Sequence, residues 1–292
     1  MGRDSAYDRA RFGKGAKMSF SSDWLALREP ADHAARAPQI AEKVFRHFSG
    51  RERITLMDFG CGTGSNLRAM AAHLPRCQTW KLIDWDEHLL ASARARLRDW
   101  ADAAHEAKDA LHLRKGDREI VVETQKADLS RDAGRLLDGV DLLTATAFFD
   151  LVSAQWMDDL CEALRARHLP LYAILTYDGR EIWSPPHAAD AAMLSAFHAH
   201  QKSDKGFGVA SGPDAATHLA QALMQRGFHV AQGASPWRLP RGELLVQLAQ
   251  GAAQAVRETG RVPASDIASW LAARENAAGC EIGHVDLFAV PD

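Results

Sequence analysis

The chain has 292 residues, 47% of them hydrophobic, which is enough to bury a substantial core. Its formal net charge is −3 with 25% charged residues, so no basic surface for nucleic acid is expected. No apolar run reaches the length of a membrane span, and residues 1–17 hold no secretory hydrophobic region, so we expect a cytoplasmic protein. The four scattered cysteines form no CxxC pair, which favours reduced thiols.

Strand and helix patterns alternate along the chain. Residues 1–20 lack periodicity and predict a disordered tail, within which Met18 is a candidate start, followed by one domain over 21–292. A helical face is expected at 32–48. The expected strands are 54–59, 80–84, 120–128, 140–147, 169–177, 228–231 and 284–290, with helices at 65–74, 89–100 and 151–165. This alternation predicts a doubly wound α/β fold with a mostly parallel sheet and helices on both faces.

Two long connections interrupt the last third of the chain. Residues 178–212 are rich in His, Gly, Pro and Asp, and a segment of this kind is typical of a lid or substrate-binding insertion. Within it, Lys205-Gly206-Phe207-Gly208 combines a hinge with a cation suited to an anionic acceptor, or else forms an ordinary surface loop. A helical insertion is expected at 238–280, with helices near 242–257 and 264–275.

A glycine-rich turn follows the first strand. Residues 56–67 read LMDFGCGTGSNL, and glycines packed this densely indicate backbone geometry that side chains would block, or a ligand against the main chain. In an open parallel sheet the first strand-to-helix turn is the expected ligand site. The glycines are Gly60, Gly62 and Gly64.

Two kinds of phosphate site fit this turn poorly. A P-loop needs a Lys–Ser/Thr pair after its last glycine, where this chain has Ser65 and Asn66. A dinucleotide turn reads G-x-G-x-x-G, and Ser65 stands where the third glycine should be. Asp58, directly before the turn, would also repel a pyrophosphate.

Acidic residues stand at three successive strand ends. Asp58 precedes the glycine turn, Asp84 ends the second strand about 20 residues after the glycines, and Asp128 ends the third strand, followed by Leu129. The spacing of Asp84 is the one at which an acid accepts from ribose hydroxyls. A cationic ligand with a ribose explains these acids better than an anionic one.

The segments DFGCGTG, LIDWDEHLLASARARL and KADL together resemble class I S-adenosylmethionine-dependent methyltransferases, specifically over residues 54 to about 152. The resemblance implies a seven-stranded sheet whose last strand is antiparallel. It also implies that the glycine turn wraps the methionine part of the cofactor, that Asp84 binds both ribose hydroxyls, and that Trp85, Asp128 and Leu129 surround the adenine. The cofactor residues implied in this way are Asp58, Gly60, Cys61, Gly62, Gly64, Asn66, Asp84, Trp85, Asp128 and Leu129.

A segment before the first strand can close the cofactor pocket in such proteins. Arg28, Asp32 and Arg36 are spaced four apart and share one face of a helix. We expect Arg36, with Arg28 as the alternative, to pair with the cofactor carboxylate. A solvated ion-pair face is the competing interpretation.

The segment after the fourth strand reads TATAFFDLVSAQWMDDL and lacks an Asn/Asp-Pro-Pro motif, which argues against a nucleic-acid base or a glutamine amide as the methyl acceptor. Asp150 is expected to fix the acceptor, unless it caps the following helix. Tyr177, His198 and His200 are candidate bases, with His200 preferred because histidine titrates near neutral pH. No third ligand is spaced to make a metal site with the histidines.

The sequence therefore predicts methyl transfer from S-adenosylmethionine to an oxygen or nitrogen of a small-molecule acceptor. The alternatives are a nicotinamide-dependent oxidoreductase and a non-catalytic S-adenosylmethionine-binding scaffold. No nucleic-acid or membrane partner is expected, and the oligomeric state is left open.

Overall fold

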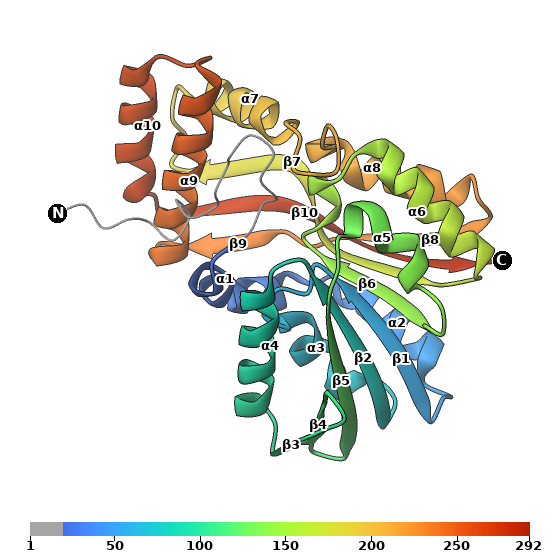
Figure 1. The fold of residues 1–292 in the computed structure, drawn as a ribbon. Helices are drawn as coiled ribbons and strands as arrows, with labels where there is room; N and C mark the ends of the chain where they lie inside the picture. The colour runs from blue at the N-terminus through green and yellow to red at the C-terminus, as the bar shows by residue number, and fades with distance from the viewer. Residues whose placement is uncertain (1–19) are drawn as a thin grey trace.

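The computed structural model describes residues 20–292, so the tail predicted for 1–20 and the start at Met18 lie outside the described residues, apart from Phe20. One twisted sheet runs through the molecule, with helices on both faces (Figure 1). Its strand order is β3-β4-β5-β2-β1-β6-β7-β10-β8, and β9 pairs with β10. The strands are β1 Arg53–Phe59, β2 Cys77–Asp84, β3 Ala103–Ala107, β4 Ala110–Lys115, β5 Arg118–Lys126, β6 Leu142–Thr146, β7 Leu171–Ser184, β8 Phe228–Ala234, β9 Trp237–Pro240 and β10 Gly279–Pro291.

The predicted doubly wound fold is confirmed. Strand β1 pairs in parallel with β2 and β6, and the last strand, β10, runs antiparallel between β7 and β8. Seven strands, β5 to β8 in the order above, make the expected sheet. The hairpin β3–β4 and the short β9 are additions that the sequence did not predict. Every residue of β3 is exposed, so it carries no alternating apolar pattern to detect.

Helices pack on the two faces of the sheet in separate groups. Helices α2, α3 and α4 share one apolar cluster with β1 and β2, and α5, α6 and α8 share another on the opposite face. The helices are α1 Ser22–Ala35, α2 Pro38–Phe48, α3 Ser65–Met70, α4 Glu87–Trp100, α5 Leu129–Leu136, α6 Ala154–Ala166, α7 Asp190–Gln201, α8 Ala215–Met224, α9 Glu243–Thr259 and α10 Ala264–Glu275. Short 3-10 helices are η2 Ala71–His73, η3 Phe149–Leu151 and η4 Gly212–Asp214.

Three predicted boundaries differ from the structure. The helix expected at 32–48 is two helices, because Pro38 begins α2 and excludes the residue before it from helical backbone. Asp128 does not end a strand: β5 stops at Lys126, and the Asp128 side chain caps α5. Ser153, not Asp150, caps α6, since its side chain accepts from Trp156 N.

The two long connections build a third apolar cluster beside the main sheet. Strand β7 continues to Ser184 within the segment expected to be a loop, and α7 follows it. Helices α7, α9 and α10 pack together against β9 and the adjoining ends of β7 and β10 (Figure 1). The predicted helices near 242–257 and 264–275 correspond to α9 and α10. The movement of 178–212 as a lid stays a prediction.

Among the described residues, none of the helices combines the length and the apolar composition that crossing a membrane requires.

Candidate functional site

The carboxyl ends of the parallel strands meet at one edge of the sheet. Phe59 of β1 lies opposite Ile83 of β2 and Ala145 of β6, so the turns that follow these strands are neighbours. A cavity lies at this edge and encloses about 1140 Å³ of empty space, including the part open to solvent. Its lining comes from α1, the glycine turn, the segments that follow β2, β5 and β6, and the loop with Lys205 and Phe207.

The glycine turn forms the floor of this cavity. Gly60, Gly62 and Gly64 all have positive φ, at 62°, 53° and 73°, a conformation that favours glycine. The turn is closed by hydrogen bonds from Cys61 N to Ile83 O and from Gly64 N to Cys61 O. A Cβ on Gly60 would lie 2.9 Å from Phe148 Cδ2, so the backbone is covered too closely for any other residue.

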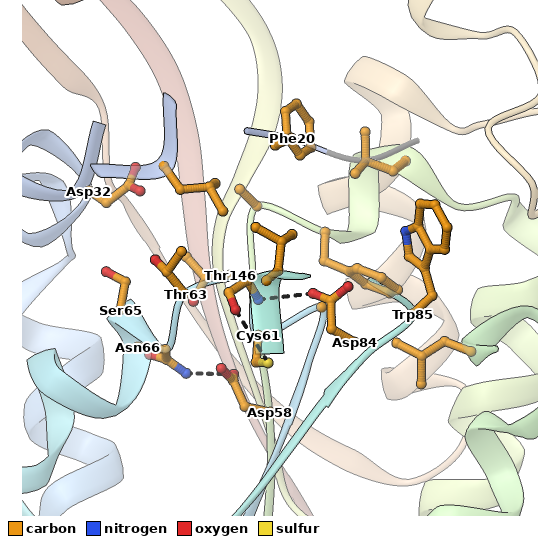
Figure 2. A pocket seen from close by; sticks show the side chains of 18 of the residues that line it. Phe20, Asp32, Asp58, Cys61, Thr63, Ser65, Asn66, Asp84, Trp85 and Thr146 are labelled. Atoms are coloured by element: carbon orange, nitrogen blue, oxygen red, sulfur yellow. Dashed lines mark hydrogen bonds between the residues drawn. The ribbon is translucent and has the colours of Figure 1, made fainter. Parts of the chain in front are cut away.

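Asp84 supports the turn from the end of β2. Its carboxylate accepts from Gly62 N at 3.0 Å, the bond drawn to Asp84 in Figure 2. It also accepts from Asp86 N at 3.0 Å. Only 6% of the residue is exposed, and burial raises the pKa of Asp84 above its usual value. Trp85 follows it and stands at one side of the cavity in Figure 2, with 36% of its surface exposed. Asp84 and Trp85 therefore place a carboxylate and an exposed aromatic ring next to each other at the cavity.

A buried hydrogen-bond chain links Asp58 to the start of α2. Asp58 accepts from Asn66 Nδ2 at 2.8 Å and from Thr144 Oγ1 at 2.7 Å, and Asn66 Oδ1 accepts from Arg36 Nη2 at 2.9 Å. Figure 2 shows Asn66 turned toward Asp58 below the cavity. Burial raises the pKa of Asp58 to about 6, although both hydrogen bonds and Arg36 oppose this shift. Arg36, which the sequence predicts to pair with the cofactor carboxylate, is therefore linked to the glycine turn through Asn66.

Helix α1 covers the opposite side of the cavity. Arg28 and Asp32 form a bidentate ion pair, with Nε–Oδ2 at 2.9 Å and Nη2–Oδ1 at 3.1 Å. Trp237 Nε1 donates to Asp32 Oδ1, and the Arg28 guanidinium lies 4.9 Å from the centroid of the Trp237 ring. His33 Nε2 lies 2.9 Å from Ser65 Oγ, which attaches α1 to the first turn of α3. The predicted ion-pair face is therefore turned inward and not toward solvent.

Lys205 and Phe207 complete the wall beyond the glycine turn. Both line the cavity, and Lys205 is 7% exposed. The Phe207 ring lies edge-on to Phe148 and Trp156, with centroids 5.7 and 5.5 Å away. These residues come from the segment that the sequence proposed as a lid.

Most of the predicted cofactor residues line the cavity, and five of the predicted site residues do not. Those that line it are Asp58, Gly60, Cys61, Gly62, Asn66, Asp84, Trp85, Asp128 and Leu129. Those outside the lining are Gly64, Arg36, Asp150, Tyr177 and His200. Gly64 serves the turn itself and packs near Leu97.

Asp150 lies just behind the cavity wall. It is in η3 between Phe148 and Leu151, which both line the cavity. Its Oδ1 is buried and has no hydrogen-bond partner among residues 20–292. Burial raises the pKa of Asp150 to about 6, and Arg28 opposes this. The structure thus leaves a carboxyl that titrates near neutral pH close to the cavity.

The other candidate bases are engaged elsewhere. Tyr177 donates to Glu181 Oε1 at 3.1 Å and lies 3.0 Å from His198 Nε2. His200 Nε2 lies 3.1 Å from Glu258 Oε2, a contact that joins α7 to α9. Burial lowers the pKa of His200 and His198 and raises that of Tyr177. Their role as bases stays a prediction.

Sequence reasoning did not single out several lining residues. Thr63, Thr146, Phe148, Leu25 and Phe20 line the cavity. Thr63 lies inside the glycine motif and Thr146 and Phe148 lie in the segment after the fourth strand, so position alone could have suggested them. Nothing in the local pattern marks Leu25 or Phe20. Within residues 20–292, no group of three or more His, Cys, Asp or Glu side chains could hold a metal ion.

Comparison with known proteins identifies the part of the chain that carries this site. Residues 57–169 match a family model described as a methyltransferase domain. This stretch contains the glycine turn, Asp84, Trp85 and Asp128, so the resemblance drawn from these residues is confirmed. No curated protein matches the chain.

Solved structures with a related arrangement are distant in sequence. A candidate methyltransferase from Bacillus halodurans is 12% identical, with 87% of this chain and 100% of that chain covered and a TM-score of 0.49. A cyclopropane synthase from Mycobacterium tuberculosis is 11% identical, with 92% and 94% covered and a TM-score of 0.49. A geranyl diphosphate C-methyltransferase from Streptomyces coelicolor is 13% identical, with 87% and 77% covered and a TM-score of 0.42. No conclusion about this chain rests on likenesses of this size.

Proposed function

We propose that this chain, an S-adenosylmethionine-dependent methyltransferase of the class I fold, methylates an oxygen or nitrogen atom of a small-molecule acceptor. The observation that carries the proposal is the cavity itself. Its lining combines the glycine turn and the strand-end acids with the apolar side chains of Phe148, Leu151 and Phe207. Residues of α1 and of the 203–211 loop also line it, which we take to favour a small acceptor over a macromolecule.

Two features of the cavity lining fit S-adenosylmethionine: unpartnered hydroxyl groups and the backbone of the glycine turn. Thr63 Oγ1 and Thr146 Oγ1 are buried and lack a hydrogen-bond partner among residues 20–292, although both residues line the cavity. Buried hydroxyls are normally satisfied, so these two are available to a polar ligand. The second feature is the backbone of the turn, where Gly60 and Gly62 have positive φ and line the cavity without side chains. Unsatisfied hydroxyls beside a side-chain-free turn are features that a nucleoside with an amino-acid tail can use.

Named residues of this chain would hold the parts of the cofactor. We assign the ribose hydroxyls to the Asp84 carboxylate and the adenine to Trp85, Leu129 and Asp128. The methionine part is assigned to the glycine turn, with Asn66 between it and Arg36. We assign Asp58 a part through Asn66, because its Oδ1 accepts from both Asn66 and Thr144.

Catalysis by this chain is mainly alignment and exclusion of water. When bound, S-adenosylmethionine supplies a methyl group that its sulfonium charge already activates. Phe148 and Leu151 border the acceptor end and limit the directions from which a nucleophile approaches. The α1 ion pair of Arg28 and Asp32 also lines the cavity. Together these side chains limit the access of water to the reacting atoms.

We assign Asp150 as the group that binds and orients the polar atom of the acceptor. It lies in η3, which follows β6, between the lining residues Phe148 and Leu151, and its Oδ1 has no hydrogen-bond partner within residues 20–292. A carboxyl with a pKa near 6 matches the task of accepting a proton from a hydroxyl or amine near neutral pH. This chemistry favours oxygen or nitrogen over a carbon acceptor.

The function is tested by binding and transfer together. Calorimetry should detect S-adenosylhomocysteine binding and no NAD binding. Incubation with methyl-labelled S-adenosylmethionine and a panel of small phenols, acids and amines should then label at least one acceptor. Binding of NAD in place of S-adenosylhomocysteine would overturn the assignment, and labelling of nucleic acid or protein alone would overturn the acceptor class.

The buried carboxyl of Asp150 makes stability depend on pH in a defined direction. Because burial raises its pKa from 3.8 to about 6, the native state holds this proton where the unfolded state has lost it. Its contribution to stability is therefore present below about pH 4 and is lost as the pH rises to about 6. We expect the Asp150→Asn protein to gain up to about 3 kcal/mol relative to the wild type between pH 4 and 7. Urea unfolding across this range measures the difference.

The exposed Asp159 provides the matched control for this measurement. The Asp159→Asn protein should not show the gain expected of Asp150→Asn, because Asp159 is exposed on α6, where it accepts from Gln155 Nε2. A constant difference between the Asp150→Asn protein and the wild type from pH 4 to 7 would contradict the buried titration.

A further inference from the structure

A second cavity lies among the helices that follow β7. Its lining comes from the end of β7, from α7 and α9, and from one residue of α10. It encloses about 550 Å³ of empty space, including the part open to solvent, and it shares no lining residue with the first cavity. Five of its lining residues carry a charge or an aromatic ring: Glu181, Trp183, Asp190, Phe197 and Trp270. The proposed function uses none of them.

Aromatic rings form much of the wall of this second cavity. The rings of Trp183 and Trp270 lie edge to face, with their centroids 5.5 Å apart. The guanidinium of Arg274 lies 5.4 Å from the centroid of the Trp183 ring and 5.6 Å from that of Trp270. A cation at such a distance is attracted by the negative face of an indole. The two tryptophans therefore already hold one cation, and Phe197 adds a third ring to the lining.

The charge of Asp190 is balanced within the protein. Its Oδ1 accepts from the Arg274 guanidinium and, at 2.8 Å, from Trp270 Nε1. Its Oδ2 accepts from His187 N at 2.8 Å. Arg274 is 1% exposed and also donates to Pro185 O at 2.6 Å. Because Arg274 and Asp190 neutralise each other, neither charge is left to attract a ligand.

Glu181 is the other carboxyl of this lining, and only neutral groups stabilise its charge. Its Oε1 accepts from the Tyr177 hydroxyl at 3.1 Å. Burial raises the pKa of Glu181, the nearby Asp190 adds to the shift, and Tyr177 and Trp183 oppose it. Within residues 20–292, none of the groups that shift this pKa is a cation. A carboxylate that is withdrawn from water without a counter-ion gains most from a cation placed beside it.

We infer that the second cavity binds a small aromatic amine, with its ammonium on Glu181 and its ring among Trp183, Phe197 and Trp270. A carboxylate beside aromatic rings attracts an ammonium in two ways, through a charge-assisted hydrogen bond and through the faces of the rings. The competing account is a protonated Glu181, for which the cavity would accept uncharged aromatic molecules equally well. The inference goes beyond the proposed function and does not rest on it, because the two cavities share no lining residue.

The test compares amines with alcohols of the same shape in the presence of saturating S-adenosylhomocysteine. The probes are tryptamine with tryptophol and phenethylamine with phenethyl alcohol. Ligand-observed NMR titration near neutral pH should show that the wild type binds at least one amine about tenfold more tightly than its alcohol, the effect of one charge-assisted hydrogen bond. The preference should disappear in the Glu181→Gln protein, because its amide carries no charge but can still accept from Tyr177.

Ala191 offers a second variant that leaves the carboxyl in place. It is exposed in the first turn of α7 and lines the second cavity. The Ala191→Phe side chain should therefore occupy part of the cavity without disturbing the core, and it should weaken the binding of amine and alcohol alike. A loss of both probes assigns them to this cavity and not to the first one.

Glu243 provides the matched control for the loss of a carboxylate. It is exposed on α9, lies outside the cavity lining and accepts from Gln247 Nε2 at 3.1 Å. The Glu243→Gln protein should keep the full preference for amines. The calorimetric affinity for S-adenosylhomocysteine should be unchanged in all three variants, which shows that each of them is folded.

Any of four results would overturn the inference. These are equal binding of amines and alcohols by the wild type, a preference for amines that survives in Glu181→Gln, unchanged binding of the probes in Ala191→Phe, and no binding of either amine at millimolar concentration. Each of them leaves the proposed function standing as long as S-adenosylhomocysteine binds. Failure of S-adenosylhomocysteine to bind the wild type would instead refute the proposed function and leave the amine site in place.

Discussion

Replacing Asp84 with alanine should lower the affinity for S-adenosylhomocysteine at least tenfold while the protein remains folded. The carboxylate is the group we assign to the ribose hydroxyls, and each charge-assisted hydrogen bond contributes about 1.5–3 kcal/mol. A loss of 1.4 kcal/mol already corresponds to a tenfold change in affinity. The side chain also accepts from Gly62 N and Asp86 N, so its removal loosens the glycine turn as well. Isothermal titration calorimetry measures the effect.

Two further variants separate these contributions. Asp84→Asn keeps an acceptor for one backbone N–H but removes the charge, and it should lie between the wild type and alanine in affinity. Asp86→Ala removes the cap of α4, whose side chain accepts from His88 N, without touching the cavity lining. Loss of that cap should cost about 1 kcal/mol of stability and leave the affinity unchanged. Wild-type affinity in the Asp84→Ala protein would refute the assignment of the cofactor to this cavity.

The Gly60→Ala substitution should abolish measurable cofactor binding and destabilise the fold. The positive φ of 62° costs an alanine about 1–2 kcal/mol. The new Cβ would also lie 2.9 Å from Phe148 Cδ2, so the ring must move from the wall that it shares with Phe207. The change therefore affects both the floor of the cavity and its acceptor end. Thermal unfolding and calorimetry with S-adenosylhomocysteine report the two effects separately.

Gly116 offers a control with the same backbone conformation and no neighbours. Its φ is 58°, and a Cβ there would meet nothing within 4 Å. The Gly116→Ala protein should therefore show the conformational cost alone and bind the cofactor as the wild type does. If the two alanine variants lose equal stability and both retain affinity, the close approach of Phe148 has no role in the site.

The sequence by itself determined the fold class and singled out most of the residues by which the glycine turn and its neighbouring acids line the cavity. Alternating strand and helix patterns specify a parallel sheet, because each element must bury its own apolar face. The acids at 58, 84 and 128 are informative for the same local reason: each lies within two residues of a strand end, and the carboxyl ends of parallel strands meet at one edge. Among these acids, the structure differs from the prediction in one position, because Asp128 caps α5 and does not end β5.

The tertiary structure alone decided the acceptor end. His200 and Glu258 are 58 residues apart in the sequence, and their contact exists because α7 packs on α9. Trp237 meets Asp32 across 205 residues, which turns a helical ion pair inward. Such contacts depend on how distant elements pack, and no local periodicity encodes them. The sequence could therefore name the residues of chemical interest in 178–212, whereas only the packing of the loop on Phe148 separated Lys205, which lines the cavity, from the histidines, which do not.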